Sequence, residues 1–175
     1  MPWYPDAKRH PLTRHFVPNK MIHPVQGLIL HITTGHPSLA GQYGDFNNPN
    51  QAPPLRSAHF LVDKDGTIWQ LIDTNDVAFA VDGVFGGPGV DNHWISVENI
   101  AAYGEALTDD QVDTCAQLYA WLARSDQLPL ALANTKTDRG LGYHRIFSGM
   151  RHPCPGDKVI AQRQAILDLC SAAYI

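Results

Sequence analysis

The feature that most constrains the fold is a short apolar run at residues 26–33, which reads QGLILHIT. A run of four to eight residues with apolar side chains on both faces is typical of a strand buried in the centre of a sheet. The run ends in Thr33, Thr34 and Gly35, which favour an exit from the strand into a loop. The sequence therefore predicts a central strand covered on both faces.

Further strands are predicted at residues 57–62, 67–72 and 94–101, with a short one at 78–81. The first two flank an Asp65-Gly66 pair, which is a strong signal for a hairpin turn. The third, WISVENIA, has a β-branched core.

Two helices accompany these strands. Thr108 and Gln111 match a capping box, and an apolar face follows with Val112, Cys115, Tyr119 and Leu122. A last amphipathic helix is expected from about residue 158 to 173, with Ile160, Ile166, Leu167 and Cys170 inward. Strands interleaved with helices indicate an α/β fold, with a mixed central β-sheet flanked by α-helices in a single domain at residues 25–175.

The remaining segments are predicted to lack extended regular structure. Residues 1–24 are expected to form an extended arm packed on the domain. Residues 36–55, rich in Gly, Asn and Pro, predict a long loop or a short helix followed by a loop. Residues 133–157 are predicted to be mostly irregular.

Composition excludes several classes of function. The formal net charge is −4 and the pI about 6.1, so nucleic acid is not an expected partner. No apolar stretch reaches the roughly 20 residues that cross a bilayer, and the N-terminus has no apolar segment of a secretory signal. We therefore expect synthesis in the cytoplasm without membrane insertion. The site of action is then the cytoplasm, or the periplasm after non-classical export or phage lysis.

The side chains that favour metal chemistry are His31, His144 and Cys154. The chain has nine histidines and three cysteines, and three cysteines do not suggest a disulfide framework. His31 closes a buried strand, where an imidazole needs a partner. Two imidazoles and one thiolate leave a tetrahedral zinc one open position for water. By spacing alone, histidines that are simply satisfied in the core are an equally good interpretation.

Three further polar side chains are candidates for the same site. Glu98 interrupts an apolar strand, which predicts either a general base with a pKa raised by burial or an ordinary edge position. His152 lies two residues before Cys154. It is predicted to be a fourth ligand, a cation that stabilises an oxyanion, or an exposed loop residue. His59 is predicted to be a strand residue that lies either behind the candidate ligands or in the wall of the groove, although a histidine that merely packs is at least as good an interpretation.

With these residues in hand, the sequence resembles the zinc N-acetylmuramoyl-L-alanine amidases of the amidase-2 superfamily, which includes the peptidoglycan recognition proteins. The resemblance covers about residues 24–168 and rests on four blocks in the family order: LILHITTG, SAHFLVDKDGTIWQLI, WISVENIA and GYHRIFSGMRHPCPGD. No single block would be specific.

The resemblance implies a function and a set of site residues. His31, His144 and Cys154 take the ligand positions for one Zn²⁺ per chain, and Glu98 falls at the acidic position of the general base. His152 falls where many members have a Lys that stabilises the intermediate. Hydrolysis of the amide between the muramyl lactyl group and L-alanine, in peptidoglycan or muropeptides, is the expected reaction. His59, Tyr143 and Asn47 are the expected substrate contacts, and a monomer is expected.

The chain departs from the family pattern in three places. Ala58 stands where the phage-lysozyme branch has a catalytic Tyr, which favours Glu98 as the acid–base group. His152 replaces the usual Lys, so its charge depends on pH near neutrality and activity is expected to fall as pH rises. Tyr143 replaces a common Gly and is expected to narrow the pocket or add a hydroxyl.

Three rival functions stay open at this stage. The first is a peptidoglycan-binding module of the same fold without hydrolysis, although such members commonly lose the thiolate ligand. The second is a cysteine peptidase using Cys154 and His144, and the third is an immunity or toxin-neutralising partner. The sequence does not distinguish a recycling enzyme from a phage lysin or a secreted bacteriolytic effector.

Overall fold

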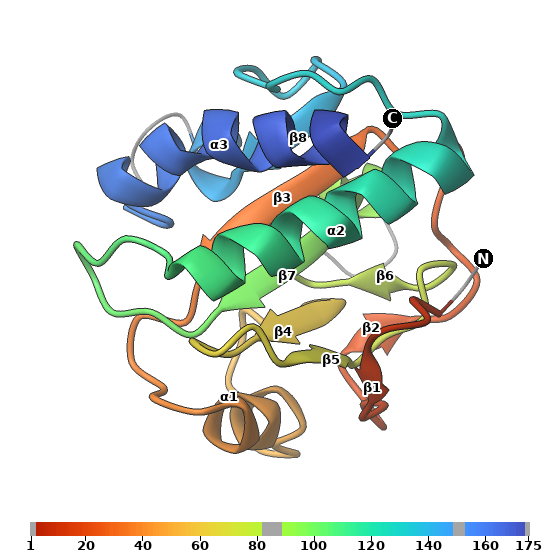
Figure 1. The fold of residues 1–175 in the computed structure, drawn as a ribbon. Helices are drawn as coiled ribbons and strands as arrows, with labels where there is room; N and C mark the ends of the chain where they lie inside the picture. Colours follow the sequence, from red (N-terminus) through yellow and green to blue (C-terminus); the bar gives the residue numbers. More distant parts are fainter. Residues whose placement is uncertain (1–2, 82–88, 149–152, 174–175) are drawn as a thin grey trace.

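The computed structural model describes residues 3–81, 89–148 and 153–173, and a six-stranded sheet forms its centre (Figure 1). The strands follow the order β1-β5-β4-β7-β3-β8. Their bounds are Lys8–Arg9 (β1), Gly27–Ile32 (β3), Phe60–Val62 (β4), Ile68–Gln70 (β5), Trp94–Asn99 (β7) and Gly140–Tyr143 (β8). β4, β7, β3 and β8 run parallel, whereas β5 is antiparallel to β4. The predicted mixed sheet and the predicted hairpin are confirmed.

The central strand is β3, as the apolar run predicts. All six of its residues are buried, and it pairs with β7 on one side and β8 on the other. Leu28, Leu30 and Ile32 belong to the main hydrophobic core. Ile29 and His31 face the other side of the sheet, because successive side chains of a strand point in opposite directions.

Helices α2 (Asp109–Asp126) and α3 (Asp157–Ala173) lie side by side across one face of the sheet (Figure 1). The capping box at Thr108 forms as predicted, and the predicted inward residues of α2 are buried. In α3, the buried residue of the first turn is Val159 rather than Ile160, which is half-buried. Within the described ranges, no helix is both long and apolar enough to span a membrane.

The opposite face of the sheet carries α1 (Leu39–Phe46), so residues 36–55 form the short helix and loop that was one of two predictions. The Ser38 side chain caps this helix by accepting from the Gly41 N–H at 3.2 Å. Leu39 and Phe46 pack in a second core cluster with Leu61 of β4. This face is only partly covered, and the cleft described below lies here.

Strand β8 lies in residues 133–157, a segment that is predicted to be mostly irregular. Before α3, the described part of that segment is irregular apart from β8 and the short 3₁₀ helix His144–Ile146, but the strand itself is not predicted. Its sequence, Gly-Leu-Gly-Tyr, has little intrinsic strand propensity, so pairing with β3 makes it a strand. The pairing needs glycines: a Cβ on Gly27 would lie 1.8 Å from the Gly140 carbonyl oxygen. Gly140 itself has φ +144°, which side-chain-bearing residues rarely adopt.

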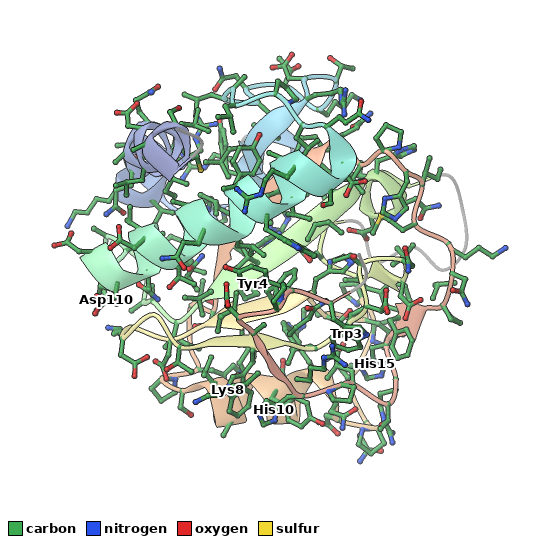
Figure 2. The ribbon with its side chains drawn as sticks, turned by 45° about the vertical axis from the view of Figure 1, so that its right-hand side comes forward. Trp3, Tyr4, Lys8, His10, His15 and Asp110 are labelled. Atoms are coloured by element: carbon green, nitrogen blue, oxygen red, sulfur yellow. The ribbon has the colours of Figure 1, made fainter. Side chains whose placement is uncertain are left out.

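The N-terminal arm contributes to both the sheet and the core. β1 joins the sheet edge beside β5, and β2 (Phe16–Val17) pairs antiparallel with β6 (Val77–Ala78). Figure 2 shows Tyr4 beneath α2, where its ring contacts the rings of Phe60 and Trp121. His10 stacks on Trp69 with ring centroids 3.7 Å apart. Residues 3–25 thus pack along the domain.

Candidate metal centre and cleft

His31 and Glu98 meet because β3 and β7 are parallel and in register. The register pairs these two residues directly, and both side chains point to the α1 face. His31 Nδ1 lies 3.9 Å from Glu98 Oε1. They stand toward the carboxyl ends of their strands, where ligand sites of α/β sheets commonly form.

His144 and Cys154 complete the group from the segment between β8 and α3. The candidate ligand atoms of His31, His144 and Cys154 all lie within 4.8 Å of one another. Cys154 Sγ is 3.9 Å from His31 Nδ1 and accepts the Ile32 N–H at 3.4 Å. The rings of His31 and His144 have centroids 4.7 Å apart. The structure thus brings together the three residues that the sequence singled out.

This donor set fits a zinc ion. Two imidazoles and one thiol provide the nitrogen and sulfur ligands that zinc prefers, at separations compatible with Zn–N and Zn–S bonds of about 2.0–2.3 Å. All three cysteines of the chain are buried, and none of them forms a disulfide, so the Cys154 thiol keeps its capacity to bind a metal. The strand end is fixed from behind, because Asn99 Nδ2 donates to the His31 carbonyl oxygen at 3.1 Å.

Burial perturbs the two acidic groups of the centre. Burial raises the pKa of Glu98 to about 8, and the charge of Arg56 acts in the opposite direction. Burial also raises the pKa of Cys154, with a further contribution from the Glu98 charge, whereas the Ile32 N–H and Arg145 lower it. A cation at this place stabilises both deprotonated forms.

A cleft of about 460 Å³ opens above the centre on the α1 face. Its floor is formed by His31, Glu98, His144 and Cys154. Its walls come from the turn after β3, from α1, and from the segments before β4 and after β6. The wall residues are 33–36, Gln42, Asp45, Phe46, 54–57 and 79–81. Part of the segment 36–55 therefore lines the cleft.

His59 does not line this cleft. It is fully buried, Nδ1 accepts the Ser96 N–H at 3.1 Å, and Nε2 donates to the Asp76 carbonyl oxygen at 3.0 Å. These two bonds hold the neutral ring in one tautomer, and burial lowers its pKa to about 4. His59 is therefore a histidine that packs in the interior, which is the alternative interpretation from the sequence.

Tyr143 and Asn47 are also not among the residues that line the cleft. Tyr143 sits on the helix-covered face, where the Arg163 guanidinium lies 4.3 Å from its ring centroid, because β8 directs it to the same side as Leu141. Asn47 follows α1, and its Oδ1 accepts from the Thr13 N–H and Oγ1. His152, the predicted oxyanion stabiliser, lies outside the described residues.

Three cleft residues escaped the sequence analysis. Arg56 Nη2 lies 3.6 Å from Asp45 Oδ2. Gln42 is 4% exposed, and its Oε1 is buried without a hydrogen-bond partner among the described residues. Arg56 could have been noticed because it directly precedes the SAHF block. Gln42 and Asp45 carry no such signal, because their position depends on where α1 docks.

Comparisons with known proteins identify a family and a fold for this chain. A family model described as Amidase_2, N-acetylmuramoyl-L-alanine amidase, matches residues 21–157. No curated protein sequence matches the chain.

Three solved structures illustrate the shared fold. A selenomethionine derivative of AmpD has a TM-score of 0.71 and 23% identity, over 94% of this chain and 96% of that one. The N-acetylmuramoyl-L-alanine amidase LysC from Clostridium intestinale has a TM-score of 0.68 and 20% identity, over 94% and 99%. A mutant of Drosophila PGRP-LB in complex with tracheal cytotoxin has a TM-score of 0.58 and 15% identity, over 83% and 85%. At these identities the likeness concerns the fold.

Proposed function

Since the chain belongs to the Amidase_2 family of N-acetylmuramoyl-L-alanine amidases, we propose that it is a zinc-dependent enzyme that hydrolyses the amide between the lactyl group of N-acetylmuramic acid and L-alanine. The observation that carries this proposal is the meeting of His31, His144 and Cys154 within 4.8 Å, with the Glu98 carboxyl 3.9 Å from His31. A metal-binding trio beside a proton-accepting group is what metal-assisted hydrolysis requires.

His31, His144 and Cys154 would hold the zinc ion. Zinc bound there supplies Lewis-acid polarisation of the scissile carbonyl and makes a water molecule acidic enough to attack near neutral pH. Glu98 accepts the proton of that water at its carboxylate and returns it to the departing amine of L-alanine. Burial raises the pKa of Glu98 and a bound cation would lower it, so the two act in opposite directions on a group that must take up and give back a proton. Stabilisation of the oxyanion is proposed for His152 on sequence grounds alone.

The proposed substrate is a muropeptide, either free or within peptidoglycan. A cleft of about 460 Å³ lies within the range of roughly 300–1,000 Å³ that small-ligand sites occupy. Arg56, Asp45 and Gln42 line it with a cation, a carboxylate and an amide. Such a set is complementary to a stem peptide, which carries amides, carboxylates and an amine.

The main rival is a recognition module that binds peptidoglycan without cutting it, since peptidoglycan recognition proteins share this fold. Purified peptidoglycan and a soluble muropeptide are incubated with wild type and with Glu98→Gln, and newly exposed alanine amino groups are measured. The proposal predicts release of alanine-terminated peptides by wild type and almost none by the variant. Binding of muropeptide by wild type without any release would support the recognition module instead.

A further inference from the structure

Arg145 connects the two chain segments that carry His144 and Cys154. It follows His144 directly in the short 3₁₀ helix His144–Ile146. Its Nη1 lies 2.7 Å from Asp157 Oδ1, at the start of α3. Its Nη2 donates to the carbonyl oxygen of Pro153 at 3.0 Å, and Pro153 directly precedes Cys154. The Arg145 guanidinium thus links the residue after His144 to the residue before Cys154.

We propose that Arg145 is a positioning residue of the metal centre, which holds the Cys154 segment against the His144 segment and so keeps the thiol in place for a metal. The part that concerns zinc rests on the proposed function. The part that concerns the placement of Cys154 is independent of it, since the bonds of Arg145 are formed by the protein alone.

The contacts of the Cys154 sulfur are weak ones. They include the Ile32 N–H at 3.4 Å, the Ile32 carbonyl oxygen at 4.0 Å and His31 Nδ1 at 3.9 Å. Bonds to sulfur are weak, whereas the bonds of a guanidinium are charge-assisted and stronger. Arg145 is 15% exposed, so water screens its bonds little. The bond to the carbonyl of Pro153 is therefore a strong contact directly beside Cys154.

The geometry of the guanidinium is essential to this role. Two different nitrogens of one planar group reach acceptors four residues apart, at Pro153 and Asp157. A lysine ammonium is a point charge on a flexible stem and does not reproduce such a fork. Because the Asp157 side chain is 90% exposed, its bond is screened by water. We therefore expect Asp157→Asn to have a smaller effect than Arg145→Lys.

The first test measures the placement of Cys154 in the metal-free protein. Arg145→Lys keeps the positive charge, so a change in the rate of thiol alkylation reports opening of the segment rather than ionisation. Cys115 and Cys170 are fully buried and provide the slow internal reference. Alkylation followed by peptide mass spectrometry should show Cys154 reacting at least about fivefold faster in the variant.

The matched control is Arg139→Lys. Arg139 also donates from its Nη2 to backbone carbonyls, those of Val25, Asp126 and Gln127, but it precedes the other end of β8. Alkylation of Cys154 should keep the wild-type rate in this control. An equal rate in wild type and Arg145→Lys would overturn the proposal.

The second test measures zinc affinity by competition with a chromophoric chelator. Residues that orient metal ligands typically contribute about 10- to 100-fold in affinity, so Arg145→Lys and Arg145→Met should bind zinc more weakly by that factor. Arg139→Lys should bind as wild type does. Wild-type affinity in Arg145→Lys would overturn the positioning role. If wild type binds no zinc but Arg145→Lys still exposes Cys154, the proposed function fails and the positioning role stands.

Discussion

The two faces of the central sheet are built from the same strands but differ in what they do. On β3 and β7, the residues Leu28, Leu30, Ile95 and Val97 pack under α2 and α3 in the main core. The alternate residues His31 and Glu98 face α1 and form the floor of the cleft. One face is closed by helices and apolar, whereas the other is partly open and carries ionisable groups.

The comparison teaches that neighbouring residues of one strand can serve stability and chemistry separately. Leu30 and His31 are adjacent, yet their side chains lie on opposite sides of the sheet, because side chains alternate along a strand. A substitution on the helix-covered face should change the free energy of unfolding with little effect on turnover. A substitution on the cleft face should lower turnover with little effect on the free energy of unfolding.

The largest expected effect is that of Glu98→Gln. Loss of the proton-accepting carboxylate should lower kcat by about 100- to 10,000-fold, the usual contribution of general acid–base catalysis. Zinc content should be unchanged, because Glu98 is not among the proposed ligands. Stability should not fall, because burial disfavours the charged carboxylate and the amide carries no charge. Peptide release and urea unfolding are measured together. Near-normal turnover would assign the base elsewhere.

Leu30→Ala tests the helix-covered face. Leu30 is fully buried in the main core, so its truncation should lower the free energy of unfolding by about 2–5 kcal/mol. Turnover per folded molecule should stay within about twofold of wild type when assayed well below the melting temperature. A loss of turnover comparable to that of Glu98→Gln in folded protein would show that the two faces are not separable.

His59 makes part of the cleft-side stability dependent on pH. Its pKa is lowered from 6.5 in the unfolded chain to about 4 by burial, so the unfolded state takes up the proton first as pH falls. This contribution is complete above about pH 6.5 and is lost as pH falls through 4, by roughly 3 kcal/mol. Urea unfolding near pH 7.5 and near pH 4 should show this loss in wild type but not in His59→Gln. An equal pH dependence in both proteins would contradict the assignment.

The smallest effect concerns two glutamines on opposite faces. Gln42→Met removes a buried Oε1 that has no partner among the described residues, so stability should rise by about 1 kcal/mol. Gln111→Met should lower stability, because the Gln111 side chain bonds the carbonyls of Val62 and Ile100 and the Thr108 N–H. Thermal unfolding of both variants decides. Destabilisation of similar size by both would mean that Gln42 is bonded in solution.

The sequence predicts the framework of the sheet because periodicity is a local property. The apolar run around Leu30 and the alternation around Glu98 predict two buried strands, and the family blocks predict the grouping of His31, His144 and Cys154. The capping box at Thr108 predicts the start of α2 to the residue. Each of these depends on side chains that are neighbours in the chain or on a specific motif.

The positions that the sequence did not predict depend instead on packing between residues far apart in the chain. β8 forms only because its glycines allow close pairing with β3, and that pairing turns Tyr143 toward Arg163. His59 is enclosed by Ser96 and Asp76, which lie far away in sequence. The Asn47 side chain accepts a hydrogen bond from Thr13 of the arm. No local pattern records which of these partners a side chain meets.

The most direct test of the account is the zinc content of purified wild type and Cys154→Ser, by elemental analysis, with amidase activity on peptidoglycan alongside. The account predicts about one zinc per wild-type chain, as a site of two imidazoles and one thiolate requires, and loss of both zinc and activity in the variant. Wild-type protein that holds no zinc, or Cys154→Ser protein that keeps both zinc and activity, would contradict it.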